Sequence, residues 1–199
     1  EKAYDNDTTI SVWVHGFSNK SKDEMETRVY GAAGGCGGEF ETMDAFGIHA
    51  PCGNTPEGET APNQRIEVGY YGAVPAPWLS PEDVAEIEAY PYDGGASGLF
   101  RYALIVAKLI RHRLDASGAT HVNMLSHSMG CLVTRTVIEN DLEGLASENR
   151  FVRWATSAGV LAGARLARLF DNPTVRSTAE LLPWDFNDFV IMNPDFVRQ

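Results

Sequence analysis

The chain has 199 residues, a length that fits one domain with a single sizeable hydrophobic core. Its formal net charge of −11 at pH 7 disfavours contact with a phosphate backbone, so we expect no nucleic-acid partner. We expect no transmembrane segment either. No apolar run approaches the ~20 residues of a membrane-spanning helix, because charges interrupt the longest candidate at Lys108, Arg111 and Arg113.

The first predicted element is a buried strand over residues 9–14, where β-branched and aromatic residues run directly into His15-Gly16. Residues 31–64 lie further along the chain and hold eight glycines, several prolines and no hydrophobic period. A loop of that length within a compact domain is usually functional. We therefore predict that residues 31–64 are an irregular insertion that forms a lid or rim beside the functional site.

Two of the three cysteines, Cys36 and Cys52, lie in this insertion, whereas Cys131 lies in an apolar segment. A Cys36–Cys52 disulfide would stabilise the insertion by ~3 kcal/mol and would indicate an oxidising compartment. Three free thiols are the alternative, and the sequence does not choose between the two. The chain starts at Glu1 without a signal peptide, as a processed secreted or periplasmic protein would, and a piece of a longer chain would look the same. We expect a secreted or periplasmic location.

Strands and helices alternate through the rest of the chain. Residues 65–71 alternate like a strand, and a proline-rich loop follows up to Tyr92. An amphipathic helix is predicted between Ser97 and Gly118, because apolar residues recur at three- and four-residue steps. The remaining predicted elements are a strand at 122–125, a helix at 130–140, a strand at 151–156 and a helix at 161–170. This order predicts one α/β domain over residues 1–199, with a mainly parallel sheet and helices on both faces.

The segment with the clearest chemistry is Ser126-His127-Ser128-Met129-Gly130, which joins the strand at 122–125 to the helix at 130–140. A sharp strand-to-helix turn lifts a serine hydroxyl above the edge of the sheet and aims the first N–H groups of the helix at a developing negative charge. Small residues must flank the serine because the turn is tight. These features predict that Ser128 is a nucleophile.

This pentapeptide resembles the nucleophile turn GHSMG of lipases in the α/β-hydrolase superfamily, with its first glycine replaced by Ser126. The run from Val12 to Phe17 resembles the lipase strand that ends in His-Gly, and the likeness covers roughly residues 9–165. The resemblance implies an α/β-hydrolase fold and a carboxylic ester hydrolase of the lipase or esterase kind, without cofactor or metal. It also implies an acyl-enzyme on Ser128 and an oxyanion hole made by the N–H groups of Phe17 and Met129. Its substrate would be a small-molecule or lipid ester.

The expected catalytic histidine is missing from the sequence. Hydrolases of this superfamily place the nucleophile first, then the acid and then the histidine. The five histidines are His15, His49, His112, His121 and His127, so none follows Ser128. Three explanations are open: further polypeptide that completes the fold and its C-terminal end, a different base, or an inactive relative. We favour the first, which predicts exposed apolar surface beside the last strand, and Asp195 is a candidate acid.

Two other residues of these motifs are given supporting roles. We expect His15 to brace the oxyanion loop by hydrogen bonding, and His127 to pack rather than to act as the base. Tyr70 and Tyr71 either floor an acyl pocket or belong to the core. The alternatives to an esterase are an acyltransferase or thioesterase on the same fold, and a non-catalytic module that binds a ligand or partner.

Overall fold

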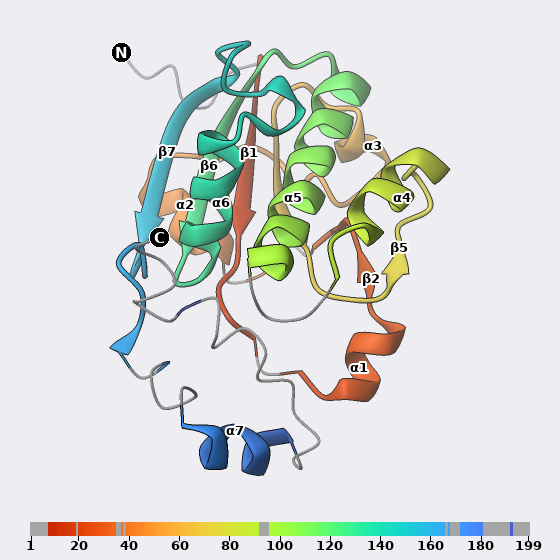
Figure 1. The fold of residues 1–199 in the computed structure, drawn as a ribbon. Helices are drawn as coiled ribbons and strands as arrows, with labels where there is room; N and C mark the ends of the chain where they lie inside the picture. The colour runs from red at the N-terminus through yellow and green to blue at the C-terminus, as the bar shows by residue number, and fades with distance from the viewer. Residues whose placement is uncertain are drawn as a thin grey trace.

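A computed structural model describes residues 8–18, 20–34, 37, 39–91, 96–165, 167, 172–180 and 192. Its main sheet has five strands in the order β3-β4-β1-β6-β7 (Figure 1). Their bounds are Thr9–Val14 (β1), Ala32–Ala33 (β3), Gln64–Gly69 (β4), His121–His127 (β6) and Phe151–Ser157 (β7). β4, β1, β6 and β7 run parallel and β3 runs antiparallel. The predicted α/β class with a mainly parallel sheet is therefore confirmed.

Helices cover both faces of this sheet. The helices α5 (Ala96–Ser117) and α6 (Gly130–Glu139) lie in front of it in Figure 1, and α2 (Glu39–Ala45) lies behind it. Successive side chains of β1 point to opposite faces of the sheet. Ile10, Val12 and Val14 therefore join the core under α5 and α6. Trp13 points to the other face, where it packs with Met43 of α2. The sheet thus has an apolar layer on each side.

The remaining elements are short. They are β2 (Val29–Tyr30) and β5 (Val74–Pro75), which pair with each other, and the helices α1 (Lys22–Thr27), α3 (Pro56–Glu59), α4 (Pro81–Glu88), a 3₁₀ turn (Leu142–Gly144) and α7 (Pro173–Glu180). We predicted a loop where α4 lies. Its beginning is encoded by Ser80-Pro81-Glu82-Asp83, since Ser80 and Asp83 form a reciprocal capping box. No helix in the described ranges is long and apolar enough to cross a membrane.

The insertion at 31–64 is less irregular than we predicted. It contains β3, α2 and α3, and its buried side chains Met43 and Ile48 pack on Trp13 and Leu125. Cys52 is in a disulfide bond and Cys131 is a buried free thiol, whereas Cys36 lies outside the described residues. Much of the insertion therefore covers the rear face of the sheet, and a lid over the site stays a prediction.

The predicted helix at 161–170 is wrong over its described first part. Leu161 and Ala162 form a turn, and Gly163 has a φ of 81°. A left-handed residue interrupts an α-helix, so the apolar spacing of this segment does not propagate into one. Leu166 and residues 168–170 lie outside the described residues.

The strand β7 is the last strand of the sheet in the part of the chain that the structure describes. Two of its large apolar side chains, Val152 and Trp154, are exposed to 39% and 37%. Trp154 also borders a shallow cavity of about 390 Å³ beside α6. Such exposed apolar side chains lie where we predicted an exposed apolar surface.

Candidate active site

Ser128 occupies a strained turn between a strand and a helix. β6 ends at His127, α6 begins at Gly130, and Ser128 has a φ of 51°, a left-handed conformation that costs a non-glycine residue ~1–2 kcal/mol. Its N–H donates to the Ser157 carbonyl at 3.0 Å, and its own carbonyl accepts from the Cys131 N–H at 3.1 Å. These bonds on both sides hold the strained residue in place, as happens at functional sites.

This turn lies where the strand order of the sheet reverses. The chain passes from β1 to β4 on one side and later returns to β6 on the other side of β1. The register pairs Val14 with Ser126, so the same register continued two residues further brings Gly16 level with Ser128. Ligands of open α/β sheets bind in the crevice at such a reversal, at the carboxyl ends of the strands. The predicted nucleophile and the His15-Gly16 motif therefore meet at that crevice.

Two glycines allow the motifs to come this close. A Cβ on Gly16 would lie only 2.7 Å from Ser128 Cβ and 3.1 Å from the His127 carbonyl. A Cβ on Gly130 would overlap the carbonyl oxygens of Val14 and His15. Each motif thus contains a glycine whose missing side chain makes room for the other motif, and we refer to this reciprocal fit as the glycine interlock.

The hydroxyl of Ser126, two residues before Ser128, is fully used in hydrogen bonds. Ser126 is 1% exposed, accepts a hydrogen bond from Thr134 Oγ1 at 3.2 Å and donates towards the Ala155 carbonyl at 3.4 Å. Trp154 Nε1 extends this chain by donating to Thr134 Oγ1 at 3.0 Å. The nearby Cys131 thiol is buried, and burial raises its pKa, so it is protonated near neutral pH and is no rival nucleophile.

Two tyrosines brace the loop that follows β1. The Tyr70 hydroxyl donates to the His15 carbonyl at 2.7 Å, and the Ser18 N–H donates to the Tyr71 hydroxyl at 3.4 Å. The His15 ring stacks on Tyr70 with centroids 4.2 Å apart, and its Nδ1 donates to the Gly16 carbonyl at 2.8 Å. His15 therefore lies where a bracing role requires it. The bracing by Tyr70 and Tyr71 was not predicted from the sequence.

Burial lowers the pKa of His15 to about 4; the Gly16 hydrogen bond opposes this shift, and the charges of Arg28 and Lys20 add to it. An unfolded histidine has a pKa of ~6.5. Between these values the unfolded chain binds the proton and the folded chain does not, so stability is lost as the pH falls. We expect this loss to total about 3 kcal/mol at most between pH 6.5 and pH 4.

A His15→Phe variant keeps an aromatic ring beside Tyr70 and removes the titration. Urea unfolding at several pH values should give a smaller loss of stability on acidification for the variant than for the wild type. Parallel losses in the two proteins would show that His15 is not protected from protonation.

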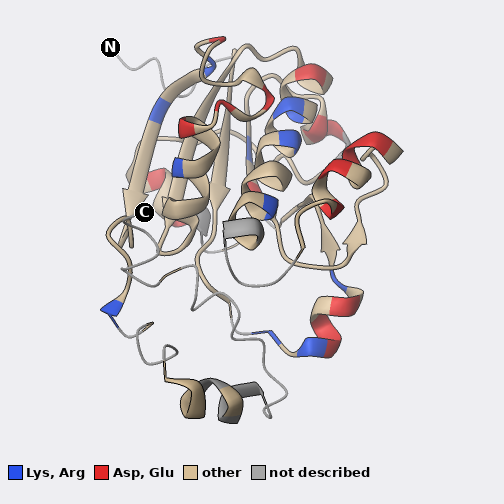
Figure 2. Cartoon of the chain, viewed as in Figure 1, with Lys and Arg blue, Asp and Glu red and all other residues tan. Residues whose placement is uncertain are grey.

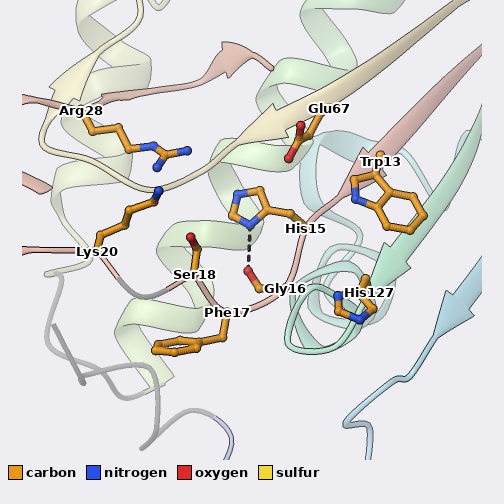
Figure 3. Close-up of a pocket in the computed structure, with 9 residues that line it drawn as sticks. All are labelled: Trp13, His15, Gly16, Phe17, Ser18, Lys20, Arg28, Glu67 and His127. Atoms are coloured by element: carbon orange, nitrogen blue, oxygen red, sulfur yellow. Dashed lines mark hydrogen bonds between the residues drawn. The ribbon is translucent and has the colours of Figure 1, made fainter. Parts of the chain in front are cut away.

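A cavity of about 360 Å³ opens beside the turn (Figure 3). Its lining is mostly polar and comes from the ends of β1, β4 and β6 together with the flanks of α1. The residues that line it are Trp13, His15, Gly16, Phe17, Ser18, Lys20, Arg28, Glu67 and His127. Gly34, at the start of the insertion, donates its N–H to the carbonyl of Glu67, so the insertion contacts a residue that lines this cavity.

The two predicted oxyanion donors lie on the two segments that meet at Ser128. Met129 follows Ser128 directly and is the N-cap of α6, without a side-chain cap. Phe17 follows Gly16 and lines the cavity. The structure thus brings both residues to the crevice, while the convergence of their N–H groups on one point stays a prediction.

The five histidines are spread over the molecule. His49 pairs with Asp44 at 3.1 Å, His112 stacks on Trp78, and His121 contacts Thr120 at the start of β6. His127 lines the cavity, and its Nδ1 lies 3.1 Å from the point that a Cβ on Gly16 would occupy. Within the described ranges no side chain is hydrogen-bonded to the Ser128 hydroxyl. The candidate acid Asp195 lies outside the described residues.

The described residues contain no group of three or more His, Cys, Asp or Glu side chains arranged to hold a metal ion. No protein-family model, curated protein or solved structure matches this chain. What the crevice at Ser128 does is therefore inferred from its own geometry and chemistry.

Proposed function

We propose that this protein is a serine hydrolase of the α/β-hydrolase type that cleaves carboxylic esters through an acyl-enzyme on Ser128. The observation that carries the proposal is the strained φ of Ser128 at a strand-to-helix turn in the crevice of the sheet. Other described residues, such as Ala158, also have a positive φ, but Ser128 combines it with a strand-to-helix turn at the crevice. A nucleophile gains exposure above the sheet edge and proximity to the helix N-terminus.

In the proposed reaction, Ser128 Oγ attacks the ester carbonyl carbon while a base takes the hydroxyl proton. The carbonyl oxygen becomes an oxyanion, to which the N–H groups of Phe17 and Met129 donate. The carbon–oxygen bond to the leaving group then breaks, and the proton passes from the base to the departing alkoxide. Water attacks the acyl-enzyme in the same manner and releases the acid and the serine. Attack by another alcohol or on a thioester would make an acyltransferase or thioesterase.

The base is proposed to come from polypeptide outside these 199 residues, since no histidine follows Ser128. Two described histidines, His15 and His127, line the cavity beside the turn. His15 stacks on Tyr70 and its Nδ1 donates to the Gly16 carbonyl, while the side chain of His127 diverges from that of its neighbour Ser128 at the tight turn, so neither is proposed as the base. The disulfide at Cys52 supports a secreted or periplasmic location.

A fluorophosphonate probe tests the nucleophile, because only an activated serine reacts with it rapidly. We expect the wild-type chain to be labelled at Ser128, as located by peptide mass spectrometry, and Ser128→Ala to remain unlabelled. Labelling should be slow, because a serine without its base keeps only the ~10³-fold catalysis of the oxyanion hole and binding.

Two variants sharpen this experiment. His127→Gln should be labelled as slowly as the wild type, and a fall to the Ser128→Ala level would place the base within the described segment. Complete absence of labelling in the folded wild type would favour a module that binds a ligand without catalysis.

A further inference from the structure

Two cations face the cavity beside Ser128. Lys20 and Arg28 flank α1, and both side chains line the cavity and lie near the His15 ring in Figure 3. One acid, Glu67, lines it as well. Figure 2 shows basic residues close to both ends of α1. A cavity with an excess of positive charge is unusual in a chain with a net charge of −11.

The backbone holds Arg28 at this position. Its N–H donates to the Glu24 carbonyl at 2.9 Å as the C-cap of α1, and its own carbonyl accepts from the Val74 N–H at 3.1 Å. Gly72 approaches so closely that a Cβ there would overlap the Arg28 carbonyl. Lys20 stands before the capping box that begins α1, in which Glu24 binds Ser21. The helix α1 therefore presents one cation from each of its flanks.

Elsewhere in the described part of the chain, six basic side chains form ion pairs with acids. Carboxylates pair with Arg65, Lys108, Arg111, Arg113, Arg135 and Arg150. Lys108, for example, is bound by Asp83, Glu86 and Glu143 at 2.6–2.9 Å. None of the ion pairs among the described residues involves Lys20 or Arg28. The charges of Lys20 and Arg28 act on the Glu24 carboxylate of α1, but neither cation forms an ion pair with it. Two cations in one cavity that no ion pair holds are complementary to an anionic group supplied from outside.

The cavity lies next to the nucleophile. Gly16 and His127 line it, and the place of a Cβ on Gly16 is 2.7 Å from Ser128 Cβ. A substrate whose ester group lies at Ser128 can therefore extend a short arm into the cavity, towards Lys20 and Arg28.

We propose that the cavity is an anion subsite, in which Lys20 and Arg28 bind a carboxylate or phosphate group carried by the ester substrate. The substrate class is thus esters with an acidic substituent rather than wholly neutral esters. The substrate class rests on the proposed function, whereas binding of an anion in the cavity can be tested without turnover.

The binding test uses the full chain with Ser128→Ala, so that no ligand is consumed. Glutarate and glycerol 3-phosphate probe a carboxylate and a phosphate, and neutral dimethyl glutarate is the comparison; affinities are measured by calorimetric titration. We expect at least one anion to bind more tightly than the neutral diester. Added salt should weaken the binding of that anion. Adding the two substitutions Lys20→Gln and Arg28→Gln should raise the Kd of that anion about tenfold or more. The control Arg135→Gln removes a surface cation of another face and should leave binding unchanged.

Selective binding of glutarate, of glycerol 3-phosphate or of both would each support the subsite and define its ligand. Anion binding no tighter than that of the neutral diester, or unchanged in the double variant, would overturn it.

Kinetics on the chain with Ser128 intact separates the subsite from the hydrolase. We expect a higher kcat/KM for 4-nitrophenyl hemiglutarate than for its methyl ester, and a rise in KM for the hemiglutarate in the double variant. Turnover of both esters without preference would support the hydrolase and refute the anion subsite. Anion binding without any turnover that depends on Ser128 would support the subsite and refute the hydrolase.

Discussion

Replacing Ser128 by glycine is expected to abolish ester hydrolysis and at the same time to make the protein more stable. The nucleophilic oxygen is lost, so no acyl-enzyme can form, and turnover of a 4-nitrophenyl ester through Ser128 should cease. The φ of 51° is costly for serine and free for glycine, so the free energy of unfolding should rise by about 1 kcal/mol. Opposite changes in activity and stability are typical of a strained catalytic residue.

Two comparisons isolate these effects. Ser128→Ala removes the oxygen but keeps a Cβ in the left-handed conformation, so it should lose activity without gaining stability. Ala158→Gly relieves a similar conformation, with a φ of 48°, at an exposed residue and should gain stability without losing activity. A folded Ser128→Gly variant that still hydrolyses the ester would refute the nucleophile, and one without added stability would refute the strain.

The substitution Gly130→Ala is expected to damage both the fold and the reaction. Its methyl group would overlap the carbonyl oxygens of Val14 and His15, which belong to the backbone and cannot rotate away. Either α6 or the end of β1 must shift, and we expect a destabilisation of about 3 kcal/mol. A displacement of ~1 Å in catalytic groups can cost ~10²-fold in rate, so turnover should fall by a similar factor.

Gly69, the last residue of β4, serves as the control. A methyl group on Gly69 would come no closer than 3.3 Å to the Ala32 carbonyl, which requires only a small adjustment. Urea denaturation and ester turnover should therefore separate the two variants clearly. If Gly130→Ala were as stable and as active as Gly69→Ala, the contact between α6 and the end of β1 would not be as tight as described.

The elements predicted best are those whose period is clear along the sequence. β1 was predicted at its observed bounds, and α5 within one residue of each end, because Gly118 with a φ of 70° stops it. The short α4 was missed although its capping box is readable at Ser80, because the surrounding prolines favour a loop. The segment after β7 shows the opposite error, because apolar spacing suggested a helix that Gly163 interrupts.

The candidate site was predictable only where its residues are contiguous. The turn at Ser128 and the His15-Gly16 motif are both local patterns, and the parallel order of strands implies that they meet. The bracing by Tyr70 and Tyr71 depends on the register between β1 and β4, which no local pattern encodes. Lys20 and Arg28 flank a six-residue helix without a hydrophobic repeat, so only the folded chain reveals that they share a cavity.

The glycine interlock also limits how this protein can diverge. Any larger residue at position 16 meets Ser128, and any larger residue at position 130 meets the backbone after β1. A single substitution at either position is therefore expected to be eliminated by selection, even though the two positions lie far apart in the sequence. A variant library randomised at one of them should return glycine alone. Replacements should be recovered only from libraries that also randomise the facing segment, where a compensating backbone shift can be selected.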